Sequence, residues 1–128
     1  MIYSIYIYIV GINIMSVSWK KNNRDRWLEI VRDSGKRRRI YWKKLAFESL
    51  GNRCSSPTCA VIGGMTDVRC LQIDHVKGGG REQRKKFCNK LTWYKFVYEQ
   101  VKIGSKDYQL LCANCNWIKR VEKKEDGS

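Results

Sequence analysis

The stretches LQIDHV (71–76) and LLCANCNWIK (110–119) decide the fold of this chain, because each is a short apolar run that ends in polar side chains. Short apolar runs bounded by turn residues are typical of strands, so we expect strands over 68–76 and 106–112. The second run continues into a sequence that favours a helix over 114–125. We expect Trp117, Ile118 and Val121 to pack inward from that helix.

One close pair of cysteines precedes the first of these strands, and a second close pair begins at the end of the second strand. Cys54 and Cys59 are separated by four residues, and Cys112 and Cys115 by two. Two such pairs with a long insert between them have the layout of a four-cysteine zinc site. Four protein ligands leave no open position, so this Zn²⁺ would be structural.

The cysteines also allow three other interpretations: inert core thiols, three disulfides in a secreted protein, or His75 in place of one cysteine at the zinc. The apolar start MIYSIYIYIVGINI has no preceding positive charge and no cleavage site after it, so a signal peptide is not indicated. We therefore expect a reducing, cytoplasmic compartment. Cys70 and Cys88 are left over and are expected to be buried free thiols.

The charge of the chain points to a polyanion as its partner. The 128 residues carry a formal net charge of +14. Residues 19–44 and 76–106 hold nearly all of the excess, which a scattered solvated surface would not concentrate in this way. Nucleic acid is the simplest such partner, with contacts mainly to its phosphate backbone. No apolar run is long enough for a membrane span, so we expect no membrane partner.

The fold class expected from this pattern is α+β, with a zinc-stapled core of a β-hairpin and a helix. Residues 1–15 form an apolar segment that is either a strand or a mis-annotated start, with Met15 as the alternative first residue. Residues 16–51 form a basic helical region, with helices over 24–33 and 37–50 separated by Ser34–Gly35. Residues 52–128 form the core, with a basic insert over 77–105. We expect this insert to hold a flexible loop through Lys86 and a helix over 89–103.

The aromatic residues of the insert are expected to form its own core or a dimer contact; base stacking is the alternative. They are Trp93, Tyr94, Phe96 and Tyr98.

If one zinc binds both cysteine pairs, the two strands are drawn together and Asp74 and His75 come close to Asn116. Carboxylate and amide oxygens suit Mg²⁺ or Mn²⁺. A neutral imidazole can take a proton from water near neutral pH. Three alternatives stay open at this point: Asp74 orients His75, Asn116 caps a helix, and His75 is a satisfied core residue.

The order of these residues resembles the HNH, or ββα-metal, nuclease family, and in particular its zinc-containing subgroup typified by the phage recombination endonuclease VII. The resemblance rests on LQIDHV, on the Cys54/Cys59 pair and on LLCANCNWIK, and it covers about residues 52–122 without most of the insert. It implies a treble-clef or ββα-metal core and cleavage of phosphodiester bonds in DNA. It implies His75 as the general base, and Asp74 and Asn116 as ligands of a catalytic Mg²⁺ or Mn²⁺.

The resemblance also implies 5′-phosphate and 3′-hydroxyl products and a phage or mobile-element setting. Cutting both strands with one active site would need a homodimer or two sequential nicks. The rival hypothesis is a treble-clef zinc module that binds DNA or RNA without cutting it. Either function would use basic residues on the phosphates, for which we expect Arg37, Arg38, Lys43, Lys44, Lys77, Arg81, Arg84, Lys85, Lys86 and Lys119.

Overall fold

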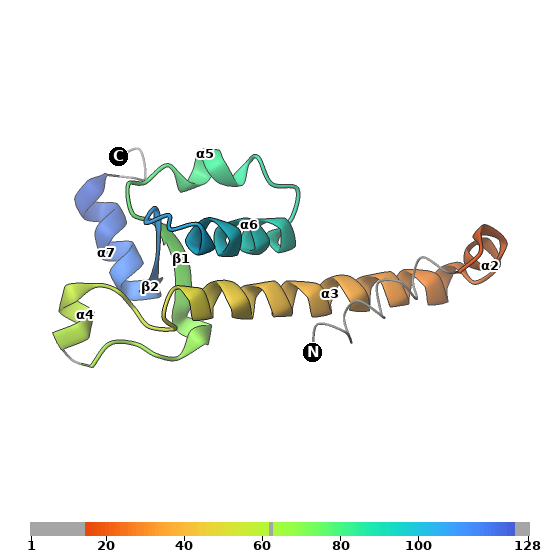
Figure 1. Ribbon diagram of the computed structural model, residues 1–128, viewed down its shortest axis with the longest axis horizontal. Helices are drawn as coiled ribbons and strands as arrows, with labels where there is room; N and C mark the ends of the chain where they lie inside the picture. Colours follow the sequence, from red (N-terminus) through yellow and green to blue (C-terminus); the bar gives the residue numbers. More distant parts are fainter. Residues whose placement is uncertain (1–14, 62, 125–128) are drawn as a thin grey trace. The chain divides into compact units, whose positions relative to one another are not determined.

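The computed structural model describes residues 15–61 and 63–124, and the chain divides into two compact units, Met1–Tyr41 and Trp42–Ser128 (Figure 1). The strand or mis-annotated start expected within residues 1–14 lies outside the described residues. The first unit contains α2 (Val17–Asn22), whose N-cap Ser16 accepts a hydrogen bond from the backbone of Trp19. In the described part of the chain, no helix is long and apolar enough to cross a bilayer.

Helix α3 (Arg24–Ser49) is continuous, so the prediction of two helices separated at Ser34–Gly35 is wrong. A glycine inside a helix costs only about 1 kcal/mol relative to alanine, which its flanking helix-forming residues can offset. Ser34 is itself buried within α3. The end of α3 belongs to the second unit, where Ala46 and Phe47 are buried.

The second unit is α+β, as predicted, and its sheet consists of β1 (Leu71–His75) and β2 (Tyr108–Cys112). The two strands are antiparallel, and their register pairs Leu71 with Cys112 and His75 with Tyr108. The other elements are α4 (Pro57–Val61), the 3-10 turn η1 (Val68–Cys70), α5 (Gly80–Arg84), α6 (Lys90–Lys102) and α7 (Ala113–Lys123).

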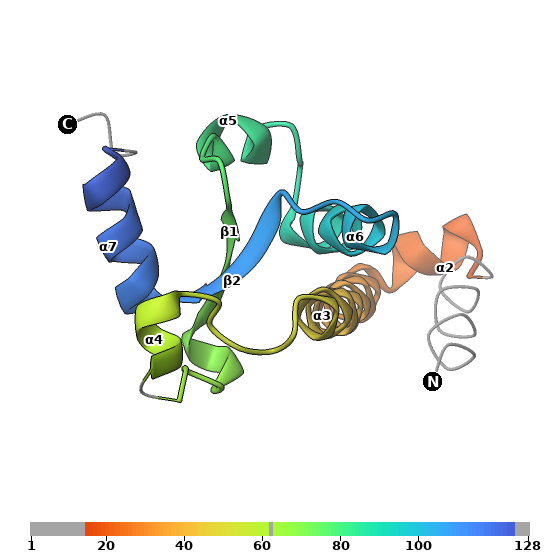
Figure 2. The same cartoon turned by 60° about the vertical axis from the view of Figure 1, so that its left-hand side comes forward.

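The two faces of the hairpin are covered by different helices (Figure 2). Successive side chains of a strand point to opposite faces, so neighbouring residues of β1 meet different helices. Leu71, Ile73 and His75 share the face toward α6 and the end of α3. Phe47 of α3 and Tyr94 of α6 meet edge to face there, with ring centroids 6.4 Å apart. Gln72 and Asp74 share the opposite face, toward α7.

The aromatic residues of the insert form a core, as predicted. Trp93 and Val97 of α6 are buried against Ala46 and Tyr108. Other side chains packed around this cluster include Phe87, Tyr94, Phe96 and Tyr98. The insert therefore covers one face of the hairpin with a layer of packed side chains.

The prediction that Trp117, Ile118 and Val121 pack inward is wrong. Their side chains are 60%, 51% and 58% exposed. The reason lies in the hairpin face that α7 covers, which presents the polar side chains of Gln72 and Asp74. The side of α7 that meets this face is therefore polar too, and the apolar side faces outward.

Two smaller predictions are also wrong. Cys70 and Cys88 are exposed, because they lie in the turn before β1 and in the bend before α6 and not in a packed element. The expected flexible loop after the glycines contains α5, a short helix whose N-cap is Gly79 in the left-handed conformation (φ +81°).

Candidate functional site

Four cysteine thiols converge at one end of the hairpin, as the spacing predicted. Cys54 follows the turn after α3, Cys59 lies in α4, Cys112 ends β2 and Cys115 lies in the first turn of α7. Their Sγ atoms all lie within 4.8 Å of one another. All four are free thiols, so the disulfide interpretation is wrong. The cluster does not include His75, so the interpretation in which His75 replaces a cysteine is also not supported.

Backbone N–H groups point at three of these sulfur atoms. The N–H of Cys112 donates to Sγ of Cys54 at 3.2 Å, that of Met65 to Cys59 at 3.4 Å, and that of Cys115 to Cys112 at 3.5 Å. Such donors stabilise thiolates, the form that binds a metal ion. A tetrahedral site with metal–sulfur bonds of about 2.3 Å needs sulfur atoms about 3.8 Å apart. The four thiols can therefore hold one metal ion after small adjustments.

Burial and hydrogen bonding shift the pKa values of two of these thiols, Cys115 and Cys112, in opposite directions. Burial raises the pKa of the Cys115 thiol to about 12. Burial would also raise the pKa of Cys112, but hydrogen bonds from Cys115, Cys54 and Cys59 outweigh it and lower the pKa of that thiol. A metal ion must displace the remaining thiol protons, so its binding weakens as the pH falls.

A cavity of about 730 Å³ lies near the other end of the hairpin. Asp74, His75 and Asn116 all line it, although they come from β1 and α7. Its remaining lining includes the three glycines 78–80 and the basic side chains of Arg81, Arg84, Lys85 and Arg120. All three residues predicted to carry the chemistry therefore line one cavity, together with basic side chains.

Asp74 is 7% exposed and has two partners on one oxygen. Its Oδ2 accepts hydrogen bonds from Nζ of Lys119 and from Nε2 of Gln109, both at 2.8 Å. Nζ of Lys119 also donates to the backbone carbonyl of His75 at 2.6 Å. A buried carboxylate needs such compensation. Lys119 was predicted to contact phosphate, and the structure instead places its ammonium on Asp74.

Asn116 is held by a hydrogen bond across to β1. Its Nδ2 donates to Oε1 of Gln72 at 2.7 Å, which leaves the carbonyl oxygen as the acceptor end of the amide. The alternative role as a helix cap is wrong, because the N-cap of α7 is Cys112.

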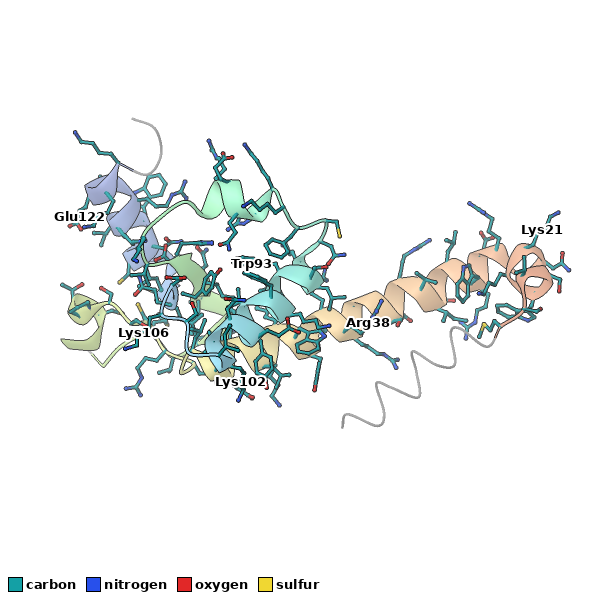
Figure 3. All side chains as sticks on the ribbon, turned by 45° about the horizontal axis from the view of Figure 1, so that its top comes forward. Lys21, Arg38, Trp93, Lys102, Lys106 and Glu122 are labelled. Atoms are coloured by element: carbon teal, nitrogen blue, oxygen red, sulfur yellow. The ribbon has the colours of Figure 1, made fainter. Side chains whose placement is uncertain are left out.

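His75 is 9% exposed and is held by three side chains. Its ring stacks on Trp93, with centroids 5.2 Å apart, and meets Tyr108 edge-on at 5.3 Å. Figure 3 shows Trp93 among the side chains between α5 and α6. Nε2 of His75 lies 2.5 Å from Oε1 of Gln83. Sequence reasoning missed Gln83, because an amide inside a charged insert carries no signal of its own.

The predicted phosphate-binding residues are distributed over several surfaces. Arg81, Arg84 and Lys85 line the main cavity, and Lys43 lines a neighbouring groove of about 560 Å³ that shares Arg84 and Asn116 with it. The remaining members lie elsewhere: Lys77 in a depression of about 400 Å³, Lys44 in an ion pair with Glu48, Lys86 exposed before α6, and Arg37 and Arg38 in the first unit. Arg120 was not predicted and joins the cavity from α7.

Comparison with protein-family models, curated proteins and solved structures found no match to this chain. The resemblance to HNH nucleases therefore rests on the sequence motifs alone.

The cysteine cluster generates the first prediction. Replacing Cys54 with serine removes one of four thiolate ligands, so we expect Zn²⁺ or Co²⁺ affinity to fall by at least about tenfold. The matched control is Cys70→Ser, because Cys70 is exposed and outside the cluster. The measurement is metal content after gel filtration, together with the sulfur-to-cobalt absorption band. Equal metal content in Cys54→Ser and in wild type would contradict the assignment.

Proposed function

We propose that this chain is a metal-dependent DNA endonuclease of the HNH type, with a structural zinc at its four cysteines. The observation that carries the proposal is the shared cavity. Asp74 and His75 come from β1 and Asn116 comes from α7, the helix whose first turn holds Cys115, and all three line this cavity. A treble-clef or ββα-metal core belongs to this proposal.

The donor atoms at the cavity fit a hard divalent cation. Asp74 supplies a carboxylate. The NH₂ group of Asn116 donates to Gln72, so its carbonyl oxygen is the atom that can bind a cation. Oxygen ligands of this kind suit Mg²⁺ or Mn²⁺. When bound, such an ion would offset the negative charge that develops on the phosphate and on the 3′ leaving oxygen.

The chain's own residues supply the remaining parts of a phosphodiester hydrolysis. His75 takes a proton from the attacking water. The guanidinium groups of Arg81, Arg84 and Arg120 are placed to bind phosphate oxygens, a contact that positions a nucleic acid backbone without reading its sequence. Attack of water on phosphorus with departure of the 3′ oxygen, which takes a proton from solvent, leaves a 5′-phosphate and a 3′-hydroxyl.

One observation favours the rival, a zinc module that binds nucleic acid without cutting. Lys119 neutralises Asp74, and an ammonium at this carboxylate stands where a catalytic cation would have to bind. In the nuclease, the divalent ion must displace Lys119 from Asp74. In the binding module, the Lys119–Asp74 pair is permanent and ties α7 to β1.

The proposed function is tested by nicking of supercoiled plasmid in Mg²⁺ or Mn²⁺. Loss of a general base costs about 10²–10⁴ in rate, so we expect His75→Ala to lower nicking by at least 10²-fold. His75 is packed against Trp93 and Tyr108, so His75→Gln is included as a bulkier variant that keeps the space filled.

The control for this experiment is Ile103→Ala, since Ile103 is 78% exposed and lines none of the three cavities described above. Full nicking by both His75 variants would contradict the assigned base. DNA binding without nicking by wild type, in either metal and on plasmid or branched duplexes, would favour the binding module.

The Lys119–Asp74 ion pair generates a separate prediction. Lys119→Met removes the competing cation, so we expect half-maximal nicking at a several-fold lower Mg²⁺ concentration than in wild type. Without Mg²⁺ the same variant should be less stable, because removing one partner of a buried pair leaves the other charge uncompensated. Lys123→Met, an exposed change on the same helix, is the control. An unchanged or higher Mg²⁺ requirement in Lys119→Met would show that Lys119 does not compete with the ion.

A further inference from the structure

Gln83 is the third residue after the glycine run, and its side chain reaches from α5 into the aromatic core beside His75. Its amide contacts His75 and Tyr108 there. Oε1 lies 2.5 Å from Nε2 of His75, and Nε2 of Gln83 donates to the hydroxyl of Tyr108 at 2.8 Å. Gln83 therefore bridges β1 and β2 at the pair His75–Tyr108, which the strand register sets opposite each other.

The chemistry of these groups decides where the imidazole proton lies. An amide oxygen only accepts hydrogen bonds, so the ring nitrogen that faces Oε1 of Gln83 must donate. The neutral ring then carries its proton on Nε2, and Nδ1 holds the lone pair. In this orientation the NH₂ group of Gln83 donates to the hydroxyl of Tyr108 at 2.8 Å, and that hydroxyl also lies within donating distance, 3.1 Å, of Oε1.

The other ring nitrogen lies on the side of the glycine run. A Cβ atom placed on Gly80 would come within 2.6 Å of Nδ1, so only glycine leaves room at this position. Among residues 15–61 and 63–124, no hydrogen bond to Nδ1 is found, and this nitrogen is not sealed from solvent. His75 and Gly80 line the same cavity. Nδ1 therefore lies beside Gly80, at the wall of this cavity.

The ring cannot easily exchange its two nitrogens by rotation. Trp93 stacks on one face of the imidazole ring with an interplanar angle of 21°, and Tyr108 packs edge to face against the same ring. Packing fixes the plane of the ring, but the packed faces do not distinguish one tautomer from the other. The hydrogen bond to Gln83 makes that distinction.

We propose that Gln83 is a positioning residue that fixes His75 in its Nε2–H tautomer and so makes Nδ1 the atom that accepts the proton from water. The base role rests on the proposed function, whereas the tautomer does not. On proton transfer Nδ1 becomes protonated, and Nε2 keeps its proton and its bond to Gln83. Nδ1 then returns its proton to solvent after the phosphodiester bond has broken.

The tautomer is measurable without any activity, because His75 is the only histidine of the chain. Long-range ¹H–¹⁵N correlation spectra of the imidazole, recorded where the ring is neutral, report which nitrogen holds the proton. We expect the Nε2–H pattern in the wild-type, zinc-loaded chain. Gln83→Glu keeps an acceptor and should keep this pattern. Gln83→Met is similar in size but offers no acceptor, and it should give a mixture of the two tautomers.

The same variants separate a positioning role from a purely structural one in cleavage assays. Gln83→Met should lower kcat about tenfold or more with little change in KM, and Gln83→Glu should retain most of kcat. Gln100→Met is the control, a glutamine on α6 with no contact to His75. Retention of the pure Nε2–H tautomer in Gln83→Met would overturn the proposal. Absence of cleavage by wild type would overturn the proposed function and the base role with it, whatever the tautomer.

Discussion

The convergence of four thiols at one end of the β1–β2 hairpin is the constraint on which the rest of the second unit depends. Cys112 closes β2 and is also the N-cap of α7, and Cys115 lies in the first turn of that helix. One cluster therefore fixes the end of a strand and the start of a helix together. The register pairs Cys112 with Leu71, so the same cluster sets where β1 begins relative to α7. A small core gains much from such a staple.

Because side chains alternate along β1, two neighbouring residues point to opposite faces of the hairpin. Asp74 and His75 are neighbours in sequence but face opposite layers, Asp74 toward Lys119 of α7 and His75 toward Trp93 of α6. Both residues line the same cavity. The carboxylate thus lies in a polar, ion-paired layer and the imidazole in an aromatic one. In the proposed nuclease, this separation would place a metal-binding carboxylate and the general base in different layers.

Sequence reasoning found the parts of this architecture whose signals are local. The spacing of Cys54, Cys59, Cys112 and Cys115 predicted the cluster, and short apolar runs predicted both strands, because these patterns follow from ligand geometry and strand period. It failed where tertiary packing decides. The outward side of α7 could not be foreseen, since the choice depends on which hairpin face that helix covers. Gln83 and Lys119 were also missed in their present roles, because each is defined by a partner far away in the sequence.

In the proposed reaction, water attacks phosphorus at this cavity, so the most direct measurement follows the oxygen atom of that water. Zinc-loaded protein would be incubated with short end-labelled DNA duplexes, linear, nicked and branched, in ¹⁸O-labelled water with Mg²⁺ or Mn²⁺. We expect fragments with a 3′-hydroxyl and with one ¹⁸O atom in the 5′-phosphate. A stable complex with every duplex and no cleavage of any of them would contradict it, and would leave a zinc module that binds nucleic acid.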